Sequence, residues 1–223
     1  PETHLAREEL YAAMRRGVKV STSQASLFER HECYRSVLNR HPRVLYLAVG
    51  SAFTGNVAAA AEWKRDNDPE DRFTIIDTGA ASGRLGLLAV AVARFARDAR
   101  DAEAVIRFAR DGVDRCEEYV FLDKLQYLAA GGRLSKSGAF FGDMLHMKPI
   151  ISPQADGARK AGVVRDRAGQ VRFALEKLKG TLKGKGKTLV MLEYSDNASW
   201  VIETVRPEIA RRWNEANAFH AEP

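Results

Sequence analysis

The chain has 223 residues, of which 45% are hydrophobic, and a formal net charge of +6 from 35 Lys and Arg against 29 Asp and Glu. Its apolar runs are shorter than the roughly 20 residues that a membrane-spanning helix needs, so we expect a soluble protein with a folded core. The only cysteines, Cys33 and Cys116, have no His or Cys at ligand spacing, which excludes a disulfide framework and a zinc site and indicates a reducing, cytoplasmic setting.

Much of the basic excess lies in the tract KLKGTLKGKGK, residues 177–187. Glycines interrupt this tract and no aromatic residues are interleaved with its lysines. A nucleic-acid site would combine both charges and stacking groups, so a solvated loop before a strand is the favoured interpretation.

The first two predicted helices are separated by a stretch rich in hydroxyl groups. Residues 3–17 predict a short amphipathic helix with Thr3 as N-cap, ending at Gly17. The stretch VKVSTSQAS, residues 18–26, then crowds four hydroxyl side chains at the start of the next helix. In that helix Leu27, Tyr34 and Leu38 have the spacing of one buried face.

Residues 43–64, RVLYLAVGSAFTGNVAAAAEWK, read as a strand, a glycine-bounded turn and a helix. The apolar run 44–49 is typical of a parallel strand covered on both faces. The turn at residues 50–56 matches neither a Walker loop nor a dinucleotide fingerprint. Free amide groups at a helix start favour a carboxylate or a phosphate, but the turn taken alone is better explained by Ser51 or Thr54 as a simple helix cap.

A second strand and helix repeat this order. Residues 73–76 predict a buried strand that ends at Asp77, and Ser82 precedes a helix. Asp77 is either a catalytic residue at the carboxyl end of a strand or a cap for the next turn. Asp101 is the predicted N-cap of a helix over residues 101–115.

The second half of the chain contains a Gly-Gly-Arg sequence and a strongly apolar segment. Arg133 follows two glycines after a helix, where its guanidinium suits a carboxylate or a phosphate. The apolar side chains that follow are either helix core or the lining for an apolar ligand. They are Phe140, Phe141, Met144 and Leu145.

The remaining elements are strands and helices in alternation. We predict strands at 149–153 and 161–165 joined by a turn at 156–157, then a long helix, and a further strand at 188–194. Pro207 is expected to interrupt the last helix. Because the chain starts on a helix and no strand follows the last one, we also expect segments of the natural protein to be absent at both ends.

The residues indicate an amphiphile-binding site better than a catalytic one. Hydroxyls at two helix starts, one arginine and a Phe/Met-rich segment suit a ligand with a polar head and an apolar tail. No nucleophile elbow, metal-ligand cluster or carboxylate pair with a positioned histidine is present in the sequence. The alternative is a metal-assisted hydrolase or phosphoryl-transfer enzyme that uses Asp77, Ser82 and Arg133.

Three separated motifs together resemble the DegV family of bacterial fatty-acid-binding proteins. They are TSQAS at 22–26, GSAFTG at 50–55 and GGRLSKSGAFFGDMLHMKPIIS at 131–152. The resemblance implies a two-domain α/β fold, with a mainly parallel sheet flanked by helices in residues 1–116 and a mixed sheet with helices in residues 117–223. It further implies that one long-chain fatty acid is held between the domains and presented to a fatty acid kinase. Such a protein would catalyse nothing itself and would need no cofactor, metal or nucleic acid. Transient contact with a membrane surface would be possible.

Site residues follow from the resemblance by matching the motifs. The lipid carboxylate would lie near five residues, which are Thr22, Ser23, Ser51, Thr54 and Arg133. The acyl tunnel would be lined by Phe53, Phe140, Phe141, Met144 and Leu145. Arg165 would face the kinase. Two departures from the family pattern stand out: Phe53 adds bulk to the turn, and the family's C-terminal histidine segment has no counterpart before Pro223.

Overall fold

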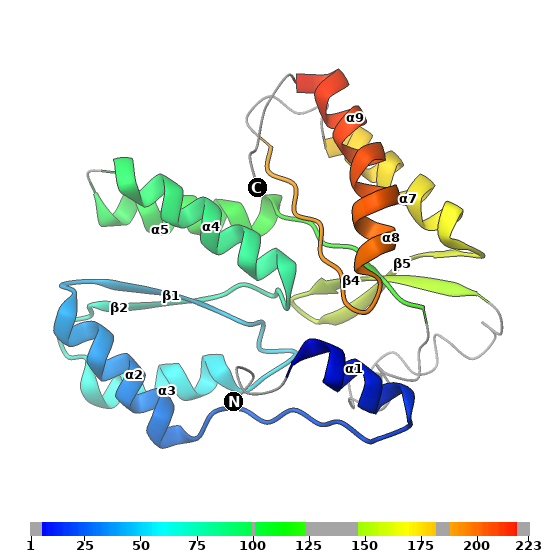
Figure 1. Cartoon of the computed structure of the whole chain (residues 1–223). Helices are drawn as coiled ribbons and strands as arrows, with labels where there is room; N and C mark the ends of the chain where they lie inside the picture. Colours follow the sequence, from blue (N-terminus) through cyan, green and yellow to red (C-terminus); the bar gives the residue numbers. More distant parts are fainter. Residues whose placement is uncertain (1–5, 100, 124–146, 182–187, 218–223) are drawn as a thin grey trace.

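The computed structural model describes residues 6–99, 101–123, 147–181 and 188–217. Its elements form two α/β units that lie side by side (Figure 1). α1 (Arg7–Arg15) comes first in the chain but lies beside the second unit, where Arg15 pairs with Asp196. The first unit contains α2 (Leu27–Arg40), β1 (Val44–Ala48), α3 (Asn56–Asn67), β2 (Phe73–Asp77), α4 (Gly83–Asp98) and α5 (Ala102–Arg115). The second contains β3 (Val120–Phe121), β4 (Lys148–Gln154), β5 (Gly157–Val164), α7 (Arg167–Thr181), α8 (Ala198–Trp200), the π-helical turn η3 (Val201–Val205) and α9 (Arg206–Asn217).

The first unit is a helix–sheet–helix sandwich around two parallel strands. β1 pairs with β2 in parallel, with Val44 opposite Phe73. Successive side chains of β1 point to opposite faces, so Tyr46 packs toward α2 and α3 while Leu47 packs toward α4 and α5. The prediction of a strand covered on both faces is therefore confirmed.

An aromatic cluster holds α2 and α3 against the sheet. Tyr34 and Trp63 are 8% and 3% exposed, and their ring centroids lie 5.5 Å apart. The predicted buried face of α2 is confirmed for Tyr34 and Leu38 and wrong for Leu27, which is 54% exposed. Leu27 lies in the first turn of α2, and that end of the helix borders an open pocket instead of a packed core.

The helix starts agree with the sequence in part. Asp101 caps α5 as predicted, because its carboxylate accepts the amides of Glu103 and Ala104 at 3.0 and 3.2 Å. The first helix begins later than predicted, with Ala6 at the N-cap position and no side-chain cap. Thr3 lies outside the described residues.

The second unit is built on an antiparallel sheet in the order β3-β4-β5. The predicted β4–β5 hairpin is confirmed, but its turn lies at residues 155–156, one residue before the predicted 156–157, and Gly157 is already the first residue of β5. All described strands of this sheet are antiparallel, so the mixed pairing expected from the resemblance is not seen among them. The segment 188–194, predicted to be a strand, pairs with none of the described strands, and Glu193 instead lies against Gly83 at the start of α4.

Pro207 does not interrupt the last helix, contrary to the prediction. The chain passes from α8 through the π-helical turn η3 and continues into α9, where Pro207 is the second residue. Proline lacks an amide hydrogen, and it is tolerated in the first turn of a helix, where that hydrogen has no intrahelical partner. The wider turn η3 thus comes directly before α9, and the proline lies in the first turn of α9.

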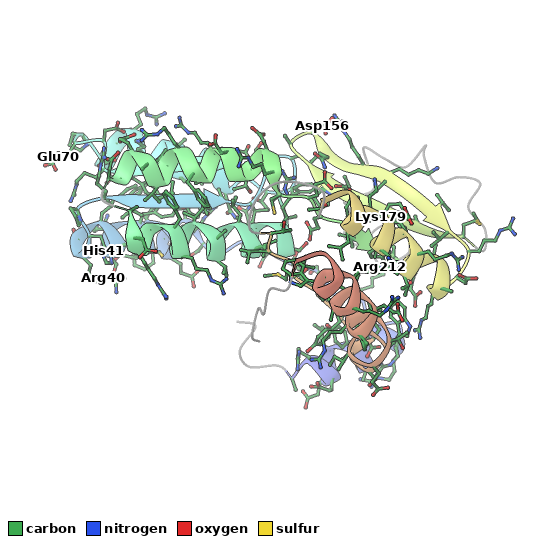
Figure 2. All side chains as sticks on the ribbon, turned by 90° about the horizontal axis from the view of Figure 1, so that it is seen from above. Arg40, His41, Glu70, Asp156, Lys179 and Arg212 are labelled. Carbon is green, nitrogen blue, oxygen red and sulfur yellow. The ribbon has the colours of Figure 1, made fainter. Side chains whose placement is uncertain are left out.

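The two units meet at the carboxyl ends of β1 and β2. The backbone of Gly79 approaches Ala155 so closely that a Cβ added at Gly79 would lie 2.9 Å from the Ala155 backbone. Arg84, 8% exposed, donates to the carbonyl oxygens of Pro153 at 3.1 Å and Val113 at 2.6 Å. Figure 2 shows Asp156 on the hairpin end nearest the first unit, whereas Arg40, His41 and Glu70 lie at the far end of that unit.

Candidate functional site

The turn after β1 is held in place by the loop after β2. The amide of Gly50 donates to Ala80 O at 2.8 Å, and the hydroxyl of Thr78 donates to Ala48 O at 2.7 Å. A Cβ at Gly50 would lie 2.8 Å from the backbone of Gly79, so this close approach requires glycine. Both loops sit at the carboxyl edge of a parallel sheet, where ligand sites of α/β folds are found.

Within that turn, Ser51 and Thr54 have different roles. The Ser51 amide donates to Asp77 Oδ1 at 3.2 Å, and Thr54 Oγ1 accepts the amide of Asn56 at 3.3 Å. The N-cap residue of α3 is Gly55, which supplies no side-chain cap. Of the two hydroxyls, it is therefore Thr54 that bonds an amide of the first helical turn.

The hydroxyl-rich loop before α2 begins the helix with a capping box. Ser26 Oγ accepts the Glu29 amide at 3.2 Å, and Glu29 Oε2 accepts the Ser26 amide at 2.8 Å. The hydroxyl and amide of Ser26 lower the pKa of Glu29. Ser26 and Glu29 are thus used to form the helix start, and Thr22 and Ser23 remain the candidates for ligand contact in this loop.

Arg30 connects the two hydroxyl-bearing segments. Its Nη1 donates to Gln24 Oε1 at 3.1 Å and to Asn56 Oδ1 at 3.2 Å. The Gln24 amide also lies against Gly55, 3.7 Å from where a Cβ would stand. Loop 22–26 and turn 50–56 are therefore held next to each other by side chains that are far apart in the sequence.

A pocket of about 540 Å³ opens between these segments. Its size falls within the range of small-molecule sites, and its wall combines hydroxyls with aromatic rings. It brings together four of the predicted site residues, Thr22, Ser23, Phe53 and Thr54. The other lining residues are Gln24, Ala25, Glu29, Arg30, Cys33, Tyr34, Tyr46 and Asn56.

The other predicted site residues lie elsewhere. Ser51 is next to the pocket but does not line it. Five predicted residues, Arg133, Phe140, Phe141, Met144 and Leu145, lie outside the described residues. Arg165 lines a separate cavity of about 370 Å³ at the start of α7, with Arg172, Phe173 and Glu176 among its neighbours.

Asp77 and Ser82, the two described residues of the alternative enzyme, form hydrogen bonds within the fold. The carboxylate of Asp77 accepts the amides of Ser51 and Gly79, the latter at 3.1 Å. Ser82 donates to Glu118 Oε1 at 2.5 Å. Within the described part of the chain, no group of three or more His, Cys, Asp or Glu side chains is placed to hold a metal ion. Asp77 does lie close to turn 50–56, but there its carboxylate accepts backbone amides. The alternative enzyme is therefore not favoured.

Sequence reasoning missed Arg30 and Tyr34. Tyr34 is buried, and its hydroxyl makes no hydrogen bond of standard geometry within the described residues; burial and the nearby Tyr46 side chain raise its pKa to about 12. The available signal was the i, i+4 spacing of Arg30 and Tyr34, which puts a cation on the helix face that carries a buried tyrosine. Helix periodicity identifies the face but not which of its polar atoms lack partners.

Among the described helices, none is both long and apolar enough to cross a membrane. The nucleic-acid interpretation of the basic tract is not tested, because residues 182–187 lie outside the described residues.

Comparisons with known proteins agree on one family. A family model described as an uncharacterised protein of the DegV family matches residues 1–218. A DegV domain-containing protein of Caldanaerobacter subterraneus is 27% identical over 177 residues, which cover 79% of this chain and 63% of that protein. One from Streptococcus pyogenes is 30% identical over 160 residues, covering 69% of this chain and 54% of its own.

Solved structures show the same fold. A fatty-acid-binding DegV family protein from Thermus thermophilus superposes with a TM-score of 0.70 at 24% identity, covering 81% of this chain and 64% of that one. A stearic-acid-binding protein from Eubacterium ventriosum gives a TM-score of 0.65 at 22% identity, over 80% and 63% of the two chains. The chain thus spans less than two thirds of these relatives' length. With a family model matched over nearly its whole length, this protein belongs to the DegV family.

Proposed function

We propose that the protein binds one long-chain fatty acid noncovalently, with the carboxylate at the pocket between loop 22–26 and turn 50–56. The observation that carries the proposal is that this pocket joins hydroxyls from both motifs, Thr22, Ser23 and Thr54, to an aromatic wall that includes Phe53. Hydroxyl donors suit an oxyanion, and aromatic surface suits the first part of an acyl chain. The fatty-acid ligands named for the structural relatives support the same ligand class.

Apolar burial would supply most of the affinity. Burying a methylene contributes about 0.8 kcal/mol, so about fourteen of them contribute on the order of 10 kcal/mol before ordering costs. The hydroxyls would orient the head group, each bond to a carboxylate contributing about 1.5 to 3 kcal/mol. We propose that Phe140, Phe141, Met144 and Leu145 continue the tunnel between domains 1–116 and 117–223, with Arg133 near the carboxylate.

The proposal includes a carrier role in the cytoplasm. The protein would present the carboxylate to a fatty acid kinase through the surface around Arg165 and catalyse nothing itself. Arg165 is exposed at the start of α7, where it is accessible to a partner protein. Transient contact with a membrane surface would allow loading.

Two measurements test lipid binding. Mass spectrometry of the gently purified protein should find a co-purifying long-chain fatty acid, and titration with oleate should show saturable binding. Thr22→Val and Ser23→Ala, at two hydroxyls that line the pocket, should each weaken oleate binding by roughly tenfold to a hundredfold. Unchanged binding in both variants would mean that these hydroxyls do not contact the carboxylate. A protein that is purified empty and ignores added oleate and palmitate would refute the proposal.

Cys33 provides a reporter within the pocket itself. It is exposed and lines the pocket, whereas Cys116 is half-buried and burial raises its pKa. Oleate should therefore slow the reaction of Cys33 with a thiol reagent and leave the slower reaction of Cys116 unchanged. Equal protection of both thiols would indicate a general conformational effect instead of occupancy of this pocket.

A further inference from the structure

Arg30 carries a positive charge that no acidic side chain of the described residues neutralises. Its two partners, Gln24 and Asn56, are neutral amides. None of the ion pairs in the described part of the chain includes Arg30. Its Nε is buried and has no hydrogen-bond partner there. Arg30 is half-buried, so its charge is partly removed from water and lacks the ion pair that such a group normally keeps.

Among the described residues that line the pocket, Arg30 is the only cationic side chain, and one acidic side chain accompanies it. That residue, Glu29, directs its Oε2 to the amide and the hydroxyl of Ser26, at 2.8 and 2.7 Å. The carboxylate of Glu29 thus binds the residue that caps α2. The charge of Arg30 remains available to a ligand.

Tyr34 adds a second donor one helical turn further along the same face of α2. The residue is 8% exposed and lines the pocket, and its buried hydroxyl makes no hydrogen bond of standard geometry within the described residues, although the Tyr46 side chain is near enough to raise its pKa further. Its ring is fixed by the neighbouring rings of Tyr46, Trp63 and Phe73, whose centroids lie 5.2 to 5.8 Å away. Because burial raises the phenol pKa to about 12, the hydroxyl keeps its proton at neutral pH and can donate it.

We propose that Arg30 and Tyr34 form a charged subsite for the ligand carboxylate, in which Arg30 Nε and the Tyr34 hydroxyl donate to its oxygens. Gln24 and Asn56 fix the plane of the guanidinium from the other edge. The inference rests on the proposed function and deepens it, since hydroxyl groups alone would accept an alcohol as readily as a carboxylate. A guanidinium selects the anion, because its bond to a carboxylate is charge-assisted.

Affinity for a charged and a neutral ligand of equal chain length separates this subsite from general lipid binding. The parent should bind oleate more tightly than oleyl alcohol. Arg30→Met should weaken oleate binding by roughly tenfold to a hundredfold and change oleyl alcohol binding by less than about threefold. Tyr34→Phe, which keeps the ring, should weaken oleate binding by about tenfold. Arg35→Met, an exposed position on the same helix that pairs with Glu32, is the matched control and should bind both ligands like the parent.

Arg30→Lys guards against loss of folding, because it keeps the charge and the long side chain but lacks Nε and the planar fork. It should show an oleate affinity between those of the parent and Arg30→Met. Urea unfolding of each variant checks that the fold is retained. Oleate binding by Arg30→Met and Tyr34→Phe that equals the parent's would overturn the subsite while leaving fatty-acid binding intact. A parent that binds neither oleate nor oleyl alcohol would overturn the proposed function together with the subsite.

Discussion

The backbone amide of Ser51 donates to the carboxylate of Asp77, at 3.2 Å from Oδ1 and 3.3 Å from Oδ2. Asp77 is the last residue of β2, and Ser51 lies in turn 50–56, which follows the neighbouring parallel strand β1. The same carboxylate accepts the amide of Gly79. A single acidic side chain thus ties together the two loops at the carboxyl edge of the sheet.

Removing that carboxylate should loosen the turn. We expect Asp77→Ala to lower the free energy of unfolding by about 1 to 2 kcal/mol, since bonds to a charged acceptor are lost at an exposed position. Oleate binding should weaken because the turn is no longer held. Asp77→Asn keeps one oxygen acceptor and should lie between the parent and Asp77→Ala. Urea unfolding and oleate titration measure both effects, and an Asp77→Ala protein equal to the parent in both would contradict this role.

The junction between the two units should be sensitive to a single methyl group at Gly79. Its φ is +57°, and an added Cβ would lie 2.9 Å from the backbone of Ala155. We expect Gly79→Ala to cost more than about 2 kcal/mol of unfolding free energy, from backbone strain and the displaced hairpin together. The measurement is denaturant unfolding.

Gly180→Ala is the matched control. Gly180 lies near the end of α7, and a Cβ there would meet no atom within 4 Å. Because alanine favours helix over glycine by up to about 1 kcal/mol, this change should be neutral or slightly stabilising. Similar losses in the two variants would show that the close contact with Ala155 is unimportant.

Much of the local structure in both units follows from the sequence. The apolar run of β1, the Asp101 cap and the paired β4–β5 hairpin depend on signals that lie within a few residues of one another. Each such signal identifies its element without knowledge of its neighbours in space. The family motifs identify the fold in the same way, through residues in fixed order along the chain.

The errors concern contacts between distant segments. Residues 188–194 have the composition of a strand, but they pair with none of the strands described in the second sheet, and Glu193 instead lies against Gly83 of α4. The pocket likewise depends on Arg30 reaching both Gln24 and Asn56. Neither of these contacts is encoded by a local pattern. Sequence periodicity therefore predicts which residues lie on a given face, but not which distant residues come into contact.

Arg165 should act in transfer and not in lipid binding. It lines a cavity other than the one that carries the hydroxyls. We expect Arg165→Ala to bind oleate within about twofold of the parent and to lower phosphorylation of the bound fatty acid by a fatty acid kinase at least tenfold, because a charged contact at the interface is lost. Arg159→Ala, an exposed arginine paired with Asp156, is the control. Equal loss in both variants would point to a general effect of surface charge.

Glu118 is a partly buried carboxylate at the start of α4. Its Oε1 accepts from Ser82 Oγ and from the amide of Gly83, at 2.5 and 3.1 Å, while its buried Oε2 has no partner within the described residues. Burial raises its pKa and the nearby charge of Glu193 raises it further, whereas the bonds from Ser82 and the backbone lower it in part. The folded protein therefore binds this proton more tightly than the unfolded chain does.

The sign of the pH dependence follows from that difference. Between the unfolded pKa, near 4.5, and the raised folded pKa, the folded state holds more protons, so stability falls as pH rises through this window. The penalty is complete above the folded pKa. Glu118→Gln removes the charge and keeps an oxygen for Ser82 and Gly83, so it should raise the urea midpoint at pH 7.5 and lose that advantage at pH 4.5. Glu62→Gln, the same change at an exposed position on α3, should show no such pH dependence. A Glu118→Gln midpoint that differs from the parent's by the same amount at both pH values would exclude titration of Glu118 as the cause.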